Sequence, residues 1–103
     1  KFPDAEEMGK IVDVHFPNIK QKLLDEALAL FFNLREIPGL KKKPSTSELI
    51  DWLKLLLAED ISPEVLHDTR QKKVIPPLHG ALLKNEQDVH LFEKLVFMHR
   101  GQR

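Results

Sequence analysis

Residues 45–57 read Ser-Thr-Ser-Glu-Leu-Ile-Asp-Trp-Leu-Lys-Leu-Leu-Leu and contain the clearest structural pattern in the chain. The Ser45 hydroxyl can accept a hydrogen bond from the backbone amide of Glu48, and the Glu48 carboxylate can reach back to the Ser45 amide, as in a capping box. Leucine and isoleucine then recur at helical spacing, at residues 49, 50, 53, 56 and 57. The stretch therefore predicts an amphipathic helix whose apolar stripe flanks Trp52, and Trp52 is expected to cover about half of that stripe.

A first helix is expected near the N-terminus. It begins at Asp4, which has Glu7 at capping-box spacing, and it closes at Phe16-Pro17. The residues that share its apolar face are Met8, Ile11, Val12 and His15.

A longer helix is expected next, because Asn18 and Gln21 repeat the same start pattern. Its apolar stripe is wide and comprises Leu23, Leu24, Ala27, Leu28, Phe31 and Phe32. Pro38-Gly39 ends this segment, since proline disfavours the α conformation in the residue before it and glycine supplies a turn.

Shorter helices are expected in the C-terminal half. Ser62-Pro63-Glu64 starts one of them, because proline stands where its missing N–H costs nothing. Residues 69–77 are first polar and basic and then end in two consecutive prolines, which predicts a loop. Residues 78–84 are expected to form one helical turn around Gly80.

A last helix is expected to open at Asn85 and Asp88, with Val89, Phe92, Leu95, Val96 and His99 on its apolar side. Neither an internal repeat nor a strand-like alternation interrupts these patterns. The chain is therefore predicted to be all-α, a single-domain bundle of four or five helices over residues 1–103.

Composition limits what this domain could bind. Hydrophobic residues at 42% and charged residues at 31% are ordinary for a globular domain. The 16 basic and 16 acidic residues cancel, which disfavours binding to nucleic acid or to an anionic membrane through the field of the whole domain. The absence of cysteine excludes disulfides and thiolate metal sites and is compatible with a reducing compartment. The chain opens without an initiator Met, which indicates a piece of a larger protein.

No catalytic or metal site is expected in the chain. No two histidines lie four residues apart on one predicted helix, and the pair His90 and Glu93 supplies too few ligands for zinc. Ser45, Ser47 and Ser62 stand at helix starts, where capping explains them. A Gly-rich phosphate loop and an acidic metal-binding strand are both missing, so the chain by itself should not hydrolyse a nucleotide.

Lys41-Lys42-Lys43 is the one local concentration of charge that suggests a ligand. The three lysines directly precede the Pro44-Ser45 start of the third helix. Because free amides at a helix N-terminus also favour anions, this corner is a candidate for facing a phosphate group. The alternative interpretation is a solvated basic loop.

Three stretches show a more specific pattern. Residues 34–53 read Leu-Arg-Glu-Ile-Pro-Gly-Leu-Lys-Lys-Lys-Pro-Ser-Thr-Ser-Glu-Leu-Ile-Asp-Trp-Leu, and residues 80–89 read Gly-Ala-Leu-Leu-Lys-Asn-Glu-Gln-Asp-Val. Phe2-Pro3-Asp4 together with residues 11–17 forms the third stretch. This pattern resembles the C-terminal lid domain of one branch of the MoxR-type AAA+ ATPases, and the run from Lys42 to Trp52 is its most specific part.

The resemblance implies a small helical bundle that follows a nucleotide-binding α/β domain and covers the adenine side of its site. It implies that the parent protein binds ATP and Mg2+, whereas this fragment alone binds no cofactor. The implied partners are the N-terminal ATPase domain of the same chain, neighbouring subunits of a ring and a von Willebrand A-type protein. Neither nucleic acid nor a membrane is implied, and the expected role is chaperone-like remodeling in the cytoplasm.

The resemblance also implies where a phosphate sensor would lie. Lids of this kind commonly place a sensor arginine at the start of a lid helix, and alignment on Ser45 puts that position at Ser47. Since serine stands there, Lys42 or Lys43 is the candidate substitute. Lysine is a flexible point charge, so it would recognise phosphate with less defined geometry than an arginine fork.

Two other functions fit parts of the sequence. A helical protein-interaction adaptor without a nucleotide role would use exposed apolar residues such as Trp52, Leu55 or Phe97 as a groove for a partner helix. A helix-turn-helix DNA-binding module is disfavoured, because Glu48 and Asp51 would lie on its recognition helix, where basic residues are expected.

Overall fold

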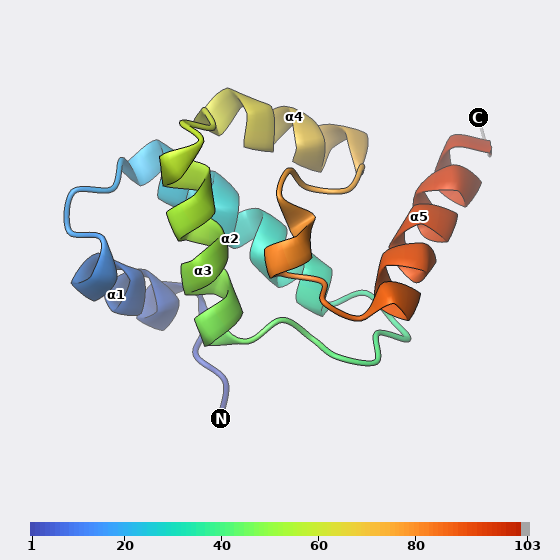
Figure 1. The fold of residues 1–103 in the computed structure, drawn as a ribbon, viewed down its shortest axis with the longest axis horizontal. Coiled ribbons are helices and arrows are strands. Elements are labelled where there is room, and N and C mark those ends of the chain that lie inside the picture. Colours follow the sequence, from blue (N-terminus) through green and yellow to red (C-terminus); the bar gives the residue numbers. More distant parts are fainter. Residues whose placement is uncertain (102–103) are drawn as a thin grey trace.

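The computed structural model of the chain describes the backbone of residues 1–101 and the side chains of residues 1–95. Within these residues it is all-helical and contains no strand, so the predicted fold class is confirmed (Figure 1). The elements are α1 (Ala5–His15), α2 (Gln21–Arg35), α3 (Thr46–Ala58), α4 (Pro63–Lys72), the 3-10 helix η1 (His79–Ala81) and α5 (Glu86–Gly101).

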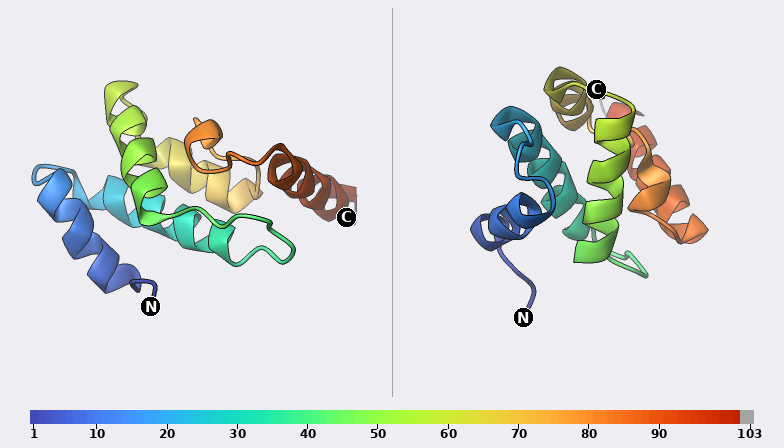
Figure 2. Two further views of the ribbon diagram at one scale, coloured as in Figure 1. Left: turned by 60° about the horizontal axis from the view of Figure 1, so that its bottom comes forward. Right: turned by 60° about the vertical axis from the view of Figure 1, so that its left-hand side comes forward.

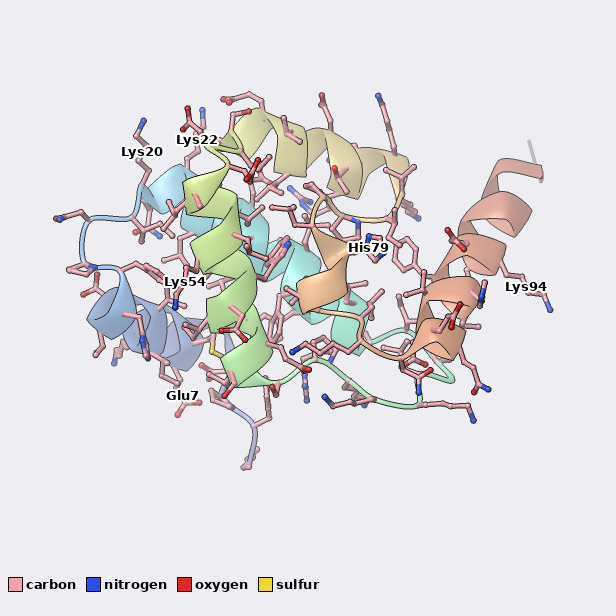
Figure 3. All side chains as sticks on the ribbon, in the orientation of Figure 1. Glu7, Lys20, Lys22, Lys54, His79 and Lys94 are labelled. Atoms are coloured by element: carbon pink, nitrogen blue, oxygen red, sulfur yellow. The ribbon has the colours of Figure 1, made fainter. Side chains whose placement is uncertain are left out.

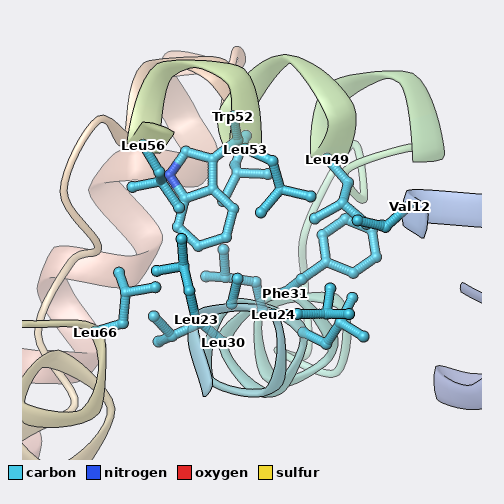
Figure 4. Close-up of a cluster of buried hydrophobic side chains, with 14 of the residues drawn as sticks. Val12, Leu23, Leu24, Leu30, Phe31, Leu49, Trp52, Leu53, Leu56 and Leu66 are labelled. Carbon is cyan, nitrogen blue, oxygen red and sulfur yellow. The ribbon is translucent and has the colours of Figure 1, made fainter. Parts of the chain in front are cut away.

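Helix α2 is the centre of the bundle. Its buried residues are Leu23, Leu24, Ala27, Leu28, Leu30, Phe31 and Leu34. Helices α1 and α4 contact it directly, and α3 crosses over it (Figure 2). Side chains of α3 meet those of α2 in one hydrophobic core, around Phe31 and Trp52 (Figure 4). Burial of this shared surface is the main favourable term holding the helices together.

Three predicted helix starts are confirmed by side-chain hydrogen bonds. The Asp4 carboxylate accepts the Glu7 amide at 2.8 Å, and the Ser45 hydroxyl accepts the Glu48 amide at 3.3 Å. Both glutamates reach back to the amide of the cap residue, so both capping boxes form. Ser62 caps α4 through its hydroxyl, with proline in the first turn as predicted.

The start of α2 differs from the prediction. Asn18 does not cap the helix, because the cap position is Lys20, which makes no side-chain hydrogen bond there. Asn18 lies instead in a turn, and the following Ile19 is partly buried against the hydrophobic core. Burial of an apolar side chain at this point decides where the helix begins, in preference to a local cap.

Residues 69–72, predicted as a loop, continue α4. Thr69 is buried, and its hydroxyl donates to the carbonyl of Val65 at 2.8 Å. Arg70 donates to the carboxylate of Glu26 on α2 at 3.0 Å. These contacts stabilise a helical turn whose polar sequence gives little local indication of it, so tertiary contacts override the local pattern.

One prediction about side-chain exposure is wrong. Trp52, predicted to be exposed in an adaptor groove, is 0% exposed, and its indole N–H donates to the carbonyl of Pro77 at 2.9 Å. His15 has the helical spacing of Met8 and Val12 but is exposed at the C-terminal end of α1. The side chains of Val96 and His99 lie outside the described residues.

The last helix begins as predicted. The Asn85 side chain accepts hydrogen bonds from the amides of Gln87 at 2.8 Å and of Asp88 at 3.3 Å, which caps α5. Val89 and Phe92 are partly buried against the hydrophobic core. In Figure 1, α5 stands at one end of the molecule, and its first turn lies near the segment that connects α2 to α3.

Replacing Trp52 with Phe should lower the free energy of unfolding by about 1–3 kcal/mol, because it leaves the Pro77 carbonyl without its partner and opens space in the core. Urea denaturation followed by circular dichroism measures the change. The matched control is Leu55→Ala on the same helix, where the side chain is 42% exposed and a smaller loss is expected. Equal stability of the Trp52→Phe protein and the unaltered chain would contradict the buried hydrogen bond.

Candidate functional site

The candidate site is the lysine loop, Lys41 to Lys43, which lies between the end of α2 and the N-terminus of α3. It holds the only run of three basic residues in the sequence. All three lysines are exposed, but the residue that follows them, Pro44, is fully buried. The loop is therefore anchored at the point where it enters α3, while its basic side chains face outward.

A carboxylate from α5 binds the backbone of this loop. Asp88 is 1% exposed, and its two oxygens accept the amides of Lys41 at 2.7 Å and of Lys42 at 3.0 Å. Paired N–H groups with a carboxylate between them form a small anion-binding concavity. An internal anion thus already occupies the amides of Lys41 and Lys42, so an external phosphate would have to be met by side chains.

A second buried carboxylate, Glu48, binds the side chain of Lys42 and the N-cap residue Ser45. Its Oε2 accepts the Lys42 ammonium at 2.8 Å, with the Lys84 ammonium 3.9 Å away. Its Oε1 accepts the Ser45 amide at 2.9 Å and the Ser45 hydroxyl at 3.2 Å. Burial alone would raise the pKa of Glu48, but the hydrogen bonds and charge of Lys42 and the bonds from Ser45 outweigh burial and lower that pKa.

Arg35, the last residue of α2, completes the anchoring. Its guanidinium donates to the carbonyl of Pro44 and lies 3.5 Å from the centroid of the Phe2 ring, a cation–π contact. Burial lowers the pKa of Arg35, which still carries its charge at neutral pH. The end of α2, the N-terminal segment and the start of α3 are thereby joined at one residue.

The four residues predicted to lie near a nucleotide occupy different environments within this segment. The Lys42 ammonium pairs with Glu48, and the Ser45 hydroxyl is engaged in the capping box. Lys43 and Ser47 are exposed, and among the described residues none forms an ion pair with Lys43. Among the described residues the arrangement offers cationic side chains but no activated nucleophile, so the chemistry that it can support is the binding of an anion.

Sequence reasoning missed the three residues that organise the loop. Asp88 and Glu48 looked like helix-start acids, and Arg35 had no assigned role. A signal for Asp88 was present, since Asn85 already supplies the cap of α5 and leaves the Asp88 carboxylate available. Nothing local indicated that its partners would be the amides of Lys41 and Lys42.

The histidines do not gather into a site among the described residues, which hold no cluster of three potential metal ligands. His67 lies 3.1 Å from the carboxylate of Glu26, which also accepts Arg70. Burial alone would raise the pKa of Glu26, but the hydrogen bonds and charges of Arg70 and His67 lower it. His90 lies within 4 Å of two exposed glutamates on its own helix, one turn to either side.

An apolar cleft of about 490 Å³ lies between the ends of α2 and α4 and the first turns of α5. We call it the α5 cleft. Its lining residues are Leu30, Asn33, Leu34, Glu36, Ile37, Thr69, Arg70, Lys73, Val74, Pro76, Phe92 and Leu95. Of the residues proposed for an adaptor groove, Leu55 is exposed but lies outside this cleft, Trp52 is buried, and the side chain of Phe97 is not among those described.

Several basic residues outside the lysine loop lie on separate helices. Lys20 and Lys22 project from the start of α2, Lys54 from α3 and Lys94 from α5 (Figure 3). Arg70, Lys72 and Lys73 form a second, weaker concentration of basic residues at the end of α4. The lysine loop remains the longest run of basic residues in the sequence.

Replacing Glu48 with Gln should destabilise the chain at pH 7 by about 1–3 kcal/mol, because Lys42 and the Ser45 amide lose a charged acceptor in a buried position. Since folding lowers the pKa of Glu48, its stabilisation is present above the ordinary value of 4.5 and is lost as the pH falls through the folded value. The difference between the two proteins should therefore shrink in acid.

Urea denaturation at a series of pH values measures this difference. The control is Asp51→Asn, which removes an exposed charge from the same helix. A constant difference between pH 7 and pH 3 would contradict the assigned role of the Glu48 carboxylate.

No helix in the part of the chain that the structure describes is long and apolar enough to cross a membrane. Comparison of the chain with models of known protein families, with curated proteins and with solved structures gives no match.

Proposed function

We propose that this chain is the C-terminal helical lid of a MoxR-type AAA+ ATPase, where it covers the nucleotide site and relays nucleotide state in a chaperone-like remodeling machine. The observation that carries the proposal is the lysine loop, where Lys41 and Lys43 stay exposed. Asp88 of α5 binds the backbone of this loop, Glu48 of α3 pairs with the Lys42 side chain, and Arg35 of α2 binds the carbonyl of the adjoining Pro44. The run from Lys42 to Trp52, which resembles that family's lid, supports it from the sequence.

Within this proposal Lys43 is the better substitute for the sensor arginine. The ammonium of Lys42 is 2.8 Å from Glu48, so binding a phosphate would compete with an existing ion pair. Lys43 is exposed and lies two residues before the N-cap Ser45, where the positive end of the α3 dipole also favours an anion. Ser47, in the first turn of α3, lies close enough in sequence to add a hydroxyl.

The parent protein would supply ATP and Mg2+ binding through its own phosphate loop, because this chain contains none. The proposed partners are the N-terminal ATPase domain of that protein, its neighbouring subunits and a von Willebrand A-type protein in the cytoplasm. The lid itself would perform no chemistry and would act by presenting the lysine loop to the terminal phosphate.

A second candidate is a helical protein-interaction module, which the α5 cleft favours. The cleft is lined mainly by apolar side chains and has the size of a site for a few side chains of a partner. In this case the lysine loop would only be a solvated connection between α2 and α3.

Replacing both Lys41 and Lys43 with Ala in the intact parent protein should lower kcat/KM for ATP by about tenfold or more, because charge-assisted contacts to phosphate are lost. Steady-state ATP turnover measures the effect, and circular dichroism checks that the fold is retained. Lys42 is left unchanged, since its removal would strand the buried Glu48 carboxylate.

The matched control is Lys10→Ala with Lys22→Ala, which removes two exposed charges from α1 and α2. Turnover equal to wild type in the Lys41 and Lys43 double variant would remove the nucleotide role from the loop. A parent protein with neither ATP turnover nor a phosphate loop would favour the interaction module.

A further inference from the structure

Helix α5 contacts the lysine loop and the residues before it in two ways. Asp88, in its first turn, accepts the amides of Lys41 and Lys42. One turn later, Leu91 lies against Gly39, where a Cβ atom added to the glycine would be 3.5 Å from the leucine Cδ2. Gly39 has φ +89°, a conformation that favours glycine, so the chain bends at this contact.

We propose that Asp88 is a positioning residue that couples α5 to the lysine loop, so that the placement of α5 regulates how Lys41 and Lys43 are presented. This rests on the proposed function, in which those lysines face the nucleotide. It adds that α5, whose Asp88 is 46 residues beyond Lys42 in the sequence, is the element through which a partner or a neighbouring domain would act on the loop.

The Asp88 carboxylate is not needed by its own helix. Asn85 already caps α5 by accepting the amides of Gln87 and Asp88, so the usual reason for an acid at this position is met without the Asp88 side chain. Both of the Asp88 oxygens instead bind amides of a segment distant in sequence. This use of a buried charge distinguishes a connection between two elements from ordinary helix capping.

The coupling between α5 and the lysine loop follows from the hydrogen bonds that would break if the two separated. If α5 moved away, two loop amides would lose charged acceptors and a 1% exposed carboxylate would lose both donors. Hydrogen bonds to a charged group stabilise the folded state even relative to water, so the loop and the first turns of α5 should open together.

Native-state hydrogen exchange on the unaltered chain tests this without a variant. The amides of Lys41 and Lys42 are expected to exchange through the same opening as those of His90 and Leu91 in α5, with protection factors that agree within about threefold. Loop amides that exchange at least about tenfold faster than these α5 amides would overturn the coupling, because the loop would then open while α5 stays in place.

The variant Asp88→Asn tests the role of the charge, because its amide nitrogen cannot accept the second loop N–H. Exchange at Lys41 and Lys42 should become about tenfold faster or more, while α2 amides keep their rates. The control is Glu86→Gln, which removes an exposed charge from the same turn of α5 and should leave loop exchange unchanged. Unchanged loop exchange in Asp88→Asn would overturn the proposal.

In the intact parent protein, Asp88→Asn should lower kcat/KM for ATP, and adding it to the Lys41 and Lys43 double variant should cause little further loss. A full additive loss would overturn the positioning role, since Asp88 would then act independently of the lysines. One combined result separates the two proposals: the loop and α5 amides exchange together, but ATP turnover is unchanged in the Lys41 and Lys43 double variant. This result would refute the proposed function and would support the connection between α5 and the loop.

Discussion

The apolar stripe of α2 is too wide for one neighbouring helix to cover, and this constraint arranges the rest of the bundle. Leu23, Leu30 and Phe31 point into a core that α3 closes, while α1 and α4 contact α2 directly. The free energy of apolar burial is proportional to the buried area and has no preferred direction. It therefore favours packing of the helices against one another but does not determine the paths of the loops between them. The indole N–H of Trp52 makes a directional contact, because its hydrogen bond to the Pro77 carbonyl holds the segment before η1 against α3.

Polar groups decide the path of the connections. Two buried carboxylates hold the lysine loop: Asp88 binds its backbone and Glu48 binds the Lys42 side chain and Ser45, so each accepts at least two hydrogen bonds. No buried polar side-chain atom among the described residues lacks a partner. Buried charges are tolerated only when they are paired in this way, so the loop has one well-defined backbone path. The outward direction of Lys41 and Lys43 is a consequence of that path.

Contacts of a carboxylate also join α2 to α4. Glu26 accepts both Arg70 and His67, and these contacts extend α4 through residues 69–72. Helix α5 meets the lysine loop through a charge, while its apolar residues Phe92 and Leu95 line the α5 cleft together with Arg70. The anchored loop and the cleft thus lie beside the same helix, which places both candidate functional surfaces next to α5.

The sequence by itself determined the helical class, the capping boxes at Asp4 and Ser45 and the start of α4, because these depend on contacts within three or four residues. It also placed the lysines beside the α3 N-terminus, since that is a matter of chain order. Only the tertiary structure decided the start of α2, the helical state of residues 69–72, the full burial of Trp52 and the pairing of Asp88 with the loop. Each of these depends on a partner far away in the chain, and local periodicity carries no information about which distant group will meet an unsatisfied amide or carboxylate.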